Sequence, residues 1–162
     1  MKVKVPEERD VFYSLKAGDK VFLSGIIYTA RDEAHRRGLP FDVKDQVIYY
    51  TGLTPTKPGS VIGSCGPTTS ARMDKWTPLL LSLGLAGMIG KGPRSSEIID
   101  AIKKYQAVYF VAIGGAAAYY TNFISKAEII AYPELGCEAI HRLEVKDFPI
   151  YVGIDSNGKT IF

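Results

Sequence analysis

The sequence is poor in the residues from which metal and redox centres are built. It contains 2 cysteines and 2 histidines among 162 residues. Cys65 and Cys137 have no second Cys or His beside them at ligand spacing. Zinc and iron–sulfur centres need three or four such ligands, and a disulfide framework needs a larger, regularly spaced set of cysteines. We therefore expect that this chain alone builds neither a disulfide framework nor a zinc or iron–sulfur centre.

Long hydrophobic runs and an excess of one charge are also missing. The longest apolar stretch, residues 107–120, is interrupted by Gly114 and Gly115 and is too short to span a bilayer. Residues 1–8 lack the apolar core of a signal peptide. The net charge is only +3, and lysines and arginines are scattered between acids, which argues against a nucleic-acid footprint. We expect a cytoplasmic protein that binds neither membrane nor nucleic acid and whose ligand is a small anion.

The pattern of the chain predicts an α/β fold. The composition, with 46% hydrophobic and 23% charged residues, is ordinary for such a domain, and the length fits one domain over residues 1–162. Strand and helix patterns alternate, which favours a mostly parallel or mixed sheet. Strands are expected at 2–5, 20–29, 46–51, 85–90, 107–113 and 127–132. Helices are expected at 7–15, 30–38, 69–84 and 94–105, a helix or irregular segment at 135–143, and a hairpin from 149–154 to 160–162. Pro78 should force a kink or a restart at Thr77, and a further helix should start at Gly114.

Residues 61–74 are the most informative stretch. A short β-branched segment runs into Gly63 and Gly66, then into three hydroxyl residues at 68–70, and then into Arg72. We interpret it as a strand, a tight turn and a helix start, where free N–H groups can receive an anion. One of residues 68–70 can cap the helix, and Arg72 can form a fork on a carboxylate or phosphate. The stretch matches neither the phosphate-loop motif nor the dinucleotide fingerprint. The sequence therefore favours an organic acid over a nucleotide.

Other predicted strand ends also open into polar or glycine-rich turns, at 29–31, 90–92 and 114–115. In open α/β sheets, ligands lie beyond the carboxyl ends of the strands. Any single arginine is more often a solvated surface residue, but several cations just beyond strand ends favour a site. If the strand ends share one edge, four side chains converge there: Arg31, Thr68, Arg72 and Lys91.

The remaining polar residues have structural alternatives. Asp32 either belongs to the site, caps a helix or holds Arg31. His35 and His141 are more often surface or core residues than catalysts, and Cys65, which has no adjacent base, is interpreted as a packing residue. The tyrosines at 49–50 and 119–120 and the leucines after Pro78 are expected in the core.

These motifs resemble a known family from about Val5 to the last residue. The segments that carry the resemblance are Leu23-Ser24-Gly25, Tyr28-Thr29-Ala30-Arg31-Asp32-Glu33-Ala34-His35, Gly63-Ser64-Cys65-Gly66-Pro67-Thr68-Thr69-Ser70-Ala71-Arg72-Met73-Asp74, Gly87-Met88-Ile89-Gly90-Lys91-Gly92 and Ala112-Ile113-Gly114-Gly115-Ala116-Ala117. They are similar to the β subunit, or C-terminal domain, of class I iron–sulfur fumarate hydratases and the related L(+)-tartrate dehydratases. The resemblance implies a single swivelling β/β/α domain and reversible hydration of fumarate to L-malate.

The resemblance also implies a partner and a set of site residues. A [4Fe–4S] cluster is expected on a separate α subunit in an α2β2-type assembly, with this chain binding no cofactor alone and being inactive or nearly so without that subunit. The implied roles are Thr68 as the catalytic residue and Arg31, Arg72 and Lys91 as ligands of the dicarboxylate substrate. Asp32, Thr69 and Gly66 are expected to support them. Cys65 stands where the family commonly has alanine.

Three alternatives remain open. An L(+)-tartrate dehydratase β subunit would share the same motifs and accept one more hydroxyl on the substrate. A non-catalytic organic-acid-binding module would use the same cations. A redox-sensing thiol at Cys65 is a third hypothesis.

Overall fold

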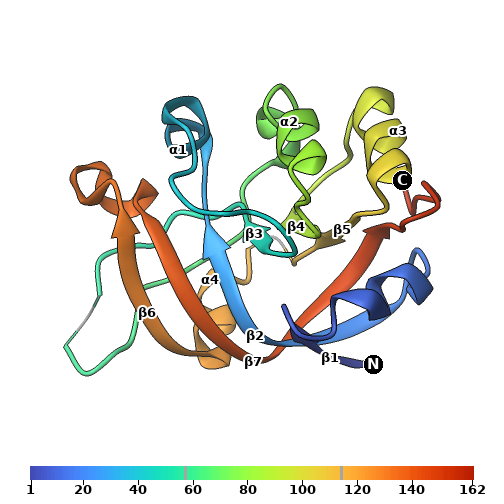
Figure 1. The fold of residues 1–162 in the computed structure, drawn as a ribbon. Helices are drawn as coiled ribbons and strands as arrows, with labels where there is room; N and C mark the ends of the chain where they lie inside the picture. The colour runs from blue at the N-terminus through green and yellow to red at the C-terminus, as the bar shows by residue number, and fades with distance from the viewer. Residues whose placement is uncertain (57, 114) are drawn as a thin grey trace.

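The computed structural model describes residues 1–56, 58–113 and 115–162, and a seven-stranded mixed sheet forms its centre (Figure 1). The strands are β1 (Lys2–Val5), β2 (Lys20–Thr29), β3 (Val47–Tyr49), β4 (Gly87–Gly90), β5 (Val108–Val111), β6 (Ile124–Ala131) and β7 (Ile140–Ile154). The α-helices are α1 (Asp32–Arg37), α2 (Thr77–Ser82), α3 (Ser96–Tyr105) and α4 (Ala117–Tyr120). Four short 3-10 helices are η1 (Arg9–Ser14), η2 (Ser70–Met73), η3 (Thr121–Phe123) and η4 (Pro133–Glu138).

The sheet closes on itself in a barrel-like arrangement. Strands β1 to β5 pair in parallel, each with the next in the chain. Strand β7, 15 residues long, pairs antiparallel with both β5 and β2 and so joins the two sides, while β6 pairs with β7 alone. The predicted α/β class with a mixed sheet is confirmed.

Successive side chains of the strands pack alternately into two hydrophobic cores. In β3, Val47 and Tyr49 belong to one core, whereas Ile48 belongs to the other. Strand β5 does the same, with Phe110 on one face and Tyr109 on the other. Because successive side chains of a strand point to opposite faces, strands covered on both faces appear as continuous apolar runs, as predicted for residues 107–113.

Helices α1, α2 and α3 lie side by side along one side of the sheet, and the long strands β6 and β7 curve along another (Figure 1). Residues of these three helices build the second core: Ala34, Leu80, Leu81, Ile98 and Ile102. The last residues lie beside α3, where a methyl group on Gly158 would contact Lys103 and Ile99. No helix in the described part of the chain is both long and apolar enough to cross a bilayer.

The predicted strand, turn and helix at residues 61–84 are partly wrong. Residues 61–66 form no strand, and the helix is split into η2 and α2. Pro78 has no N–H to donate and its ring clashes with the carbonyl four residues earlier, so α2 begins at Thr77, as the predicted restart required. The segment η2 has only 4 residues, and Thr69 at its N-cap makes no side-chain capping bond. The predicted helix start is therefore a short 3-10 segment, and the predicted hydroxyl cap is not formed by Thr69.

Other predictions need correction near the end of the chain. Strand β7 already begins at Ile140, inside the segment expected as helical or irregular. The expected terminal hairpin is reduced to one bridge between Ile154 and Thr160. Three residues expected in the core are exposed: Leu79, Leu83 and Tyr119. The predicted helix start at Gly114 lies outside the described residues, and α4 begins at Ala117.

Candidate active site

The parallel strands bring the predicted site segments to one edge of the sheet. Just beyond β2, the Ala30 N–H donates to the carbonyl of Tyr49 at the end of β3 (3.1 Å). The Thr68 N–H donates to the carbonyl of Tyr50 (2.7 Å). Thr69 forms a parallel bridge with Lys91, which follows β4. The backbone thus ties the segments that carry Arg31, Thr68, Arg72 and Lys91 into one neighbourhood, as the strand-end argument predicted.

Arg72 is held by an acid from another segment. Its Nε donates to Oδ2 of Asp32 at 2.9 Å, and its Nη2 lies 2.7 Å from the same oxygen. Asp32 therefore pairs with Arg72 and not with Arg31. Of the alternatives for Asp32, this geometry favours a place beside the predicted site. The Arg72 side chain is 51% exposed, so this guanidinium is both oriented and accessible.

Arg31 precedes α1 and is more enclosed. Its side chain is 25% exposed, and its Nε lies 3.6 Å from Oε1 of Glu138. Sequence reasoning missed Glu138, because nothing in the spacing of residues 133–138 indicates that their turn folds back onto β2. The expected cationic residues are therefore accompanied by two acids, Asp32 and Glu138.

Thr68 is half-buried, whereas Thr69 and Lys91 are exposed. The turn before Thr68 is fixed at Gly66, whose carbonyl accepts a hydrogen bond from Thr51 Oγ1 at 2.6 Å. A methyl group on Gly66 would lie 3.1 Å from Cβ of Ala117. Gly66 is therefore closely packed, and its backbone position is fixed.

A buried polar network beneath this edge was not predicted. The Arg94 side chain is fully buried; its Nε donates to Oδ1 of Asp74 at 2.6 Å and its Nη2 to Oγ1 of Thr77 at 2.9 Å. Burial opposes the charge of Arg94, but its neighbours, Tyr50 and Asp74 foremost, leave its pKa raised. This ion pair joins the segment that carries Arg72 to the loop after Lys91. The preceding Gly92-Pro93 gives no sequence signal that the next arginine is buried.

A second buried contact fixes Ser70. The hydroxyl of Tyr109 lies 2.8 Å from Ser70 Oγ and donates to the carbonyl of Gly92 at 2.7 Å. A methyl group on Gly90 would come within 1.9 Å of Ser70 Oγ. Only glycine at position 90 therefore allows Ser70 and its neighbours to lie against β4.

The two cysteines do not fit a metal cluster. Cys65 is fully buried in the first core, and burial raises the pKa of its thiol to about 12, so it packs as a small apolar residue at neutral pH. Cys137 is exposed. No group of three or more His, Cys, Asp or Glu residues stands at metal-binding distances within the described residues. The packing role expected of Cys65 agrees with this burial, and of the surface or core role expected of His35 the core role holds, since His35 is buried.

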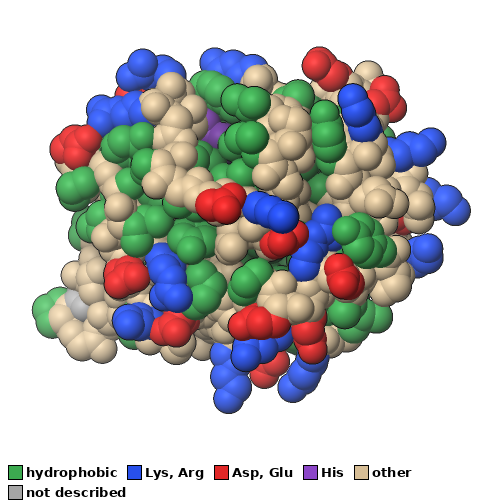
Figure 2. Space-filling model, viewed as in Figure 1, with side chains coloured by type: hydrophobic (Ala, Val, Ile, Leu, Met, Phe, Trp, Pro, Cys, Tyr) green, Lys and Arg blue, Asp and Glu red, His purple; other side chains and the backbone are tan. Residues whose placement is uncertain are grey.

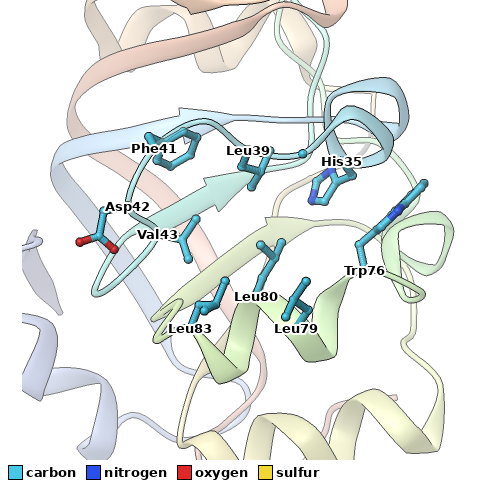
Figure 3. A pocket seen from close by; sticks show the side chains of 10 residues that line it. His35, Leu39, Phe41, Asp42, Val43, Trp76, Leu79, Leu80 and Leu83 are labelled. Carbon is cyan, nitrogen blue, oxygen red and sulfur yellow. The ribbon is translucent and has the colours of Figure 1, made fainter.

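A separate groove lies between α1 and α2 (Figure 3). It has a volume of about 380 Å³ and is lined mainly by apolar residues, among them Leu39, Trp76 and Leu79, with His35 on one side. Figure 2 shows hydrophobic side chains gathered over this part of the surface. The lining includes no lysine or arginine, so the groove offers no cation to an anionic ligand, unlike the edge with Arg31 and Arg72.

Comparison with known proteins finds similarity along the whole chain. The family described as "Fumarase C-terminus" matches residues 1–162. The aerobic class I fumarate hydratase of Salmonella typhimurium is 41% identical over 154 residues, which are 88% of this chain and 27% of that protein. Fumarate hydratase 2 of Leishmania major is 35% identical over 173 residues, 100% of this chain and 30% of that protein.

A shorter relative matches over most of its own length. The putative L(+)-tartrate dehydratase subunit beta of Methanocaldococcus jannaschii is 39% identical over 163 residues, 91% of this chain and 84% of that subunit. The chain thus spans less than a third of the length of the fumarate hydratases but nearly all of the tartrate dehydratase subunit. On these matches, the chain belongs to the Fumarase C-terminus family.

Proposed function

We propose that this chain is the β subunit of a hydro-lyase that adds water reversibly to fumarate to give L-malate. The observation that carries the proposal is that the segments of Arg31, Arg72, Lys91 and Thr68 are tied together at the carboxyl ends of parallel strands. Relatives named as fumarate hydratases support the same reaction. A planar dicarboxylate matches a site with two guanidinium groups and one ammonium, since each guanidinium can bind one carboxylate with two N–H donors.

The proposed chemistry assigns separate tasks to these side chains. Removing the proton next to a carboxylate of malate builds negative charge on that carboxylate in the transition state, and fixed cations stabilise it. Arg31, Arg72 and Lys91 perform that task and orient the substrate. Thr68 carries the proton to or from the carbon atom. Its hydroxyl is a weak base by itself, so we propose that an acid of the partner subunit assists it.

A partner subunit completes the proposed site. The described residues of this chain offer no ligand set for an iron–sulfur cluster, and we propose that a [4Fe–4S] cluster resides on a separate α subunit in an α2β2-type assembly. Within it this chain would act as a swivelling domain and be inactive or nearly so alone. The relative named as a subunit beta supports a division of the enzyme into two chains.

The proposal is tested by co-expressing this chain with the candidate α subunit under anaerobic conditions. The loss of fumarate absorbance is then measured for the mixture and for each chain alone. Activity in the mixture only, and its loss in Arg72→Ala, supports the proposal. A stable complex with an intact cluster but no turnover of fumarate or malate contradicts it.

The shorter relative favours a second candidate, the β subunit of an L(+)-tartrate dehydratase, which converts tartrate to oxaloacetate. The same complex distinguishes the two, because turnover of malate and tartrate can be compared side by side. A chain that forms no complex but binds dicarboxylates tightly alone would instead be an organic-acid-binding module. Weak binding by the isolated chain is expected of half a site.

A further inference from the structure

The guanidinium of Arg31 is more confined than a position just after β2 requires. Its Nε is buried and has no hydrogen-bond partner among the described residues. A methyl group on Gly52 would lie 2.9 Å from its Nη1. The guanidinium is thus confined from the side of β3, and only a nearby negative charge can offset the burial of its own charge.

Glu138 supplies that charge. Its Oε1 lies 3.6 Å from Nε of Arg31, a distance too long for a hydrogen bond but within ion-pair range. The two side chains are 25% and 30% exposed. Because both are largely shielded from solvent, their attraction is screened less than that of a surface pair.

The turn that carries Glu138 is anchored next to Arg31 on one side. The carbonyl of Ala139 accepts a hydrogen bond from Thr29 Oγ1 (3.4 Å), and the same hydroxyl oxygen accepts one from the His141 N–H (3.0 Å). Thr29 stands two positions before Arg31. The start of β7 is therefore fixed to the end of β2, and Glu138 is fixed with it.

The same turn is anchored on the other side of the guanidinium. The carbonyl of Cys137 accepts a hydrogen bond from the Leu53 N–H at 2.9 Å. Leu53 follows Gly52, the residue that confines Nη1 of Arg31. Glu138 is consequently held by two independent segments in a position that faces Nε of Arg31.

We propose that Glu138 is a positioning residue for Arg31. It holds the guanidinium from the Nε side, so that the terminal nitrogens remain available to a substrate carboxylate. Asp32 holds Arg72 in a comparable way, through Nε and Nη2. The inference rests on the proposed function, because it concerns the same dicarboxylate site.

A positioning role and a competing role of Glu138 predict opposite changes in KM when the charge of Glu138 is removed. If Glu138 merely competed with the substrate for Arg31, its neutralisation would strengthen anion binding through Coulomb's law. If it orients Arg31, its neutralisation releases the guanidinium and weakens binding. The direction of the change in KM therefore separates the two roles.

The first experiment uses the complex with the α subunit. Glu138→Gln is expected to raise KM for fumarate roughly tenfold with kcat much less affected, since a ground-state contact is lost. Glu134→Gln is the matched control, because Glu134 lies in the same turn but pairs with Arg37; its KM should be unchanged. In an Arg31→Lys background, Glu138→Gln should have little further effect.

A second experiment needs no activity. In the ¹⁵N-labelled chain, the Nε–H resonance of Arg31 should exchange faster with water in Glu138→Gln than in the wild type or in Glu134→Gln. A lowered or unchanged KM, or unchanged exchange, would overturn the proposal. If the wild-type complex has no hydratase activity, the proposed function fails, and the exchange measurement alone decides the role of Glu138.

Discussion

One oxygen of Asp32 receives both Nε and Nη2 of Arg72, at 2.9 Å and 2.7 Å, across segments that are far apart in the sequence. The pair joins the start of α1 to η2 at the edge where β2 and β3 end. Because Asp32 uses one side of the guanidinium, the other side is left to an external anion. This contact gives Arg72 a defined direction despite its exposure.

Asp32→Asn is therefore expected to affect substrate binding more than stability. A half-exposed ion pair contributes about 0–1 kcal/mol to the free energy of unfolding, whereas loss of the orientation of Arg72 should raise KM for the dicarboxylate roughly tenfold. Steady-state kinetics of the complex and urea unfolding measure the two effects. Glu33→Gln, which removes pairing to Arg36 and Arg37 on the same helix, serves as the control and should leave KM unchanged.

Gly90→Ala should destabilise the chain and impair the site together. The new methyl group would overlap Ser70 Oγ at 1.9 Å, and a forced shift in a packed region costs about 1–3 kcal/mol. In Gly87→Ala of the same strand, the nearest atoms would be aromatic carbons of Phe12 and Phe110 at 3.1 and 3.2 Å, and the loss should be smaller. The free energies of unfolding of both variants in urea make the comparison. Equal losses of stability would show that the overlap with Ser70 is not the cause.

Breaking the buried pair of Arg94 and Asp74 should be among the costliest single changes. Removing one partner of such a pair leaves an uncompensated buried charge and costs about 3–5 kcal/mol. Asp74→Asn and Arg94→Met should both show this loss in urea unfolding. Arg142→Met removes a half-exposed arginine whose ion pair with Glu128 is 3.9 Å long; its loss should be small. Similar losses in all three variants would contradict the role of the network.

His35 should make stability fall in mildly acidic solution. Burial lowers its pKa below the usual 6.5, although the Arg31 carbonyl and Asp32 act in the opposite direction. The unfolded chain then binds a proton more readily than the folded chain. The contribution of His35 is fully present above about pH 6.5 and is lost as the pH falls from there toward its lower folded pKa, by at most about 1.4 kcal/mol per pH unit.

Unfolding free energies at several pH values between about 7.5 and 5 test this dependence. His35→Gln should flatten the profile. His141→Gln is the comparison, because burial also lowers the pKa of His141 and its variant should remove a separate part of the slope. A profile unaffected by His35→Gln would show that His35 does not titrate on unfolding.

The sequence was sufficient to predict the features that depend on local pattern and on the general topology of a parallel sheet. The continuous apolar run at 107–113 predicted a strand covered on both faces, and parallel pairing then brought Arg31, Thr68, Arg72 and Lys91 to one edge. Pro78 marked the start of α2 through its missing N–H. Each of these features depends on neighbours along the chain or on the general geometry of parallel sheets.

The sequence was insufficient to predict the features that depend on contacts between segments far apart in the chain. Strand β7 shows no regular alternation of polar and apolar residues from Ile140 onward, and its course depends on pairing with β2, more than a hundred residues earlier. The same pairing brings Glu138 to Arg31. Burial of Arg94 likewise depends on Asp74 and Thr77 approaching it in space. No local period or spacing encodes these contacts.

We propose that Thr68, at the same edge as Arg31, Arg72 and Lys91, transfers the proton in a dicarboxylate hydro-lyase. The most direct test is kcat for malate dehydration by the reconstituted complex with Thr68→Val, beside Thr160→Val near the end of the chain as control. The account predicts a loss of about 10²-fold or more for Thr68→Val and wild-type turnover for Thr160→Val. Turnover by Thr68→Val close to that of the wild type would contradict it.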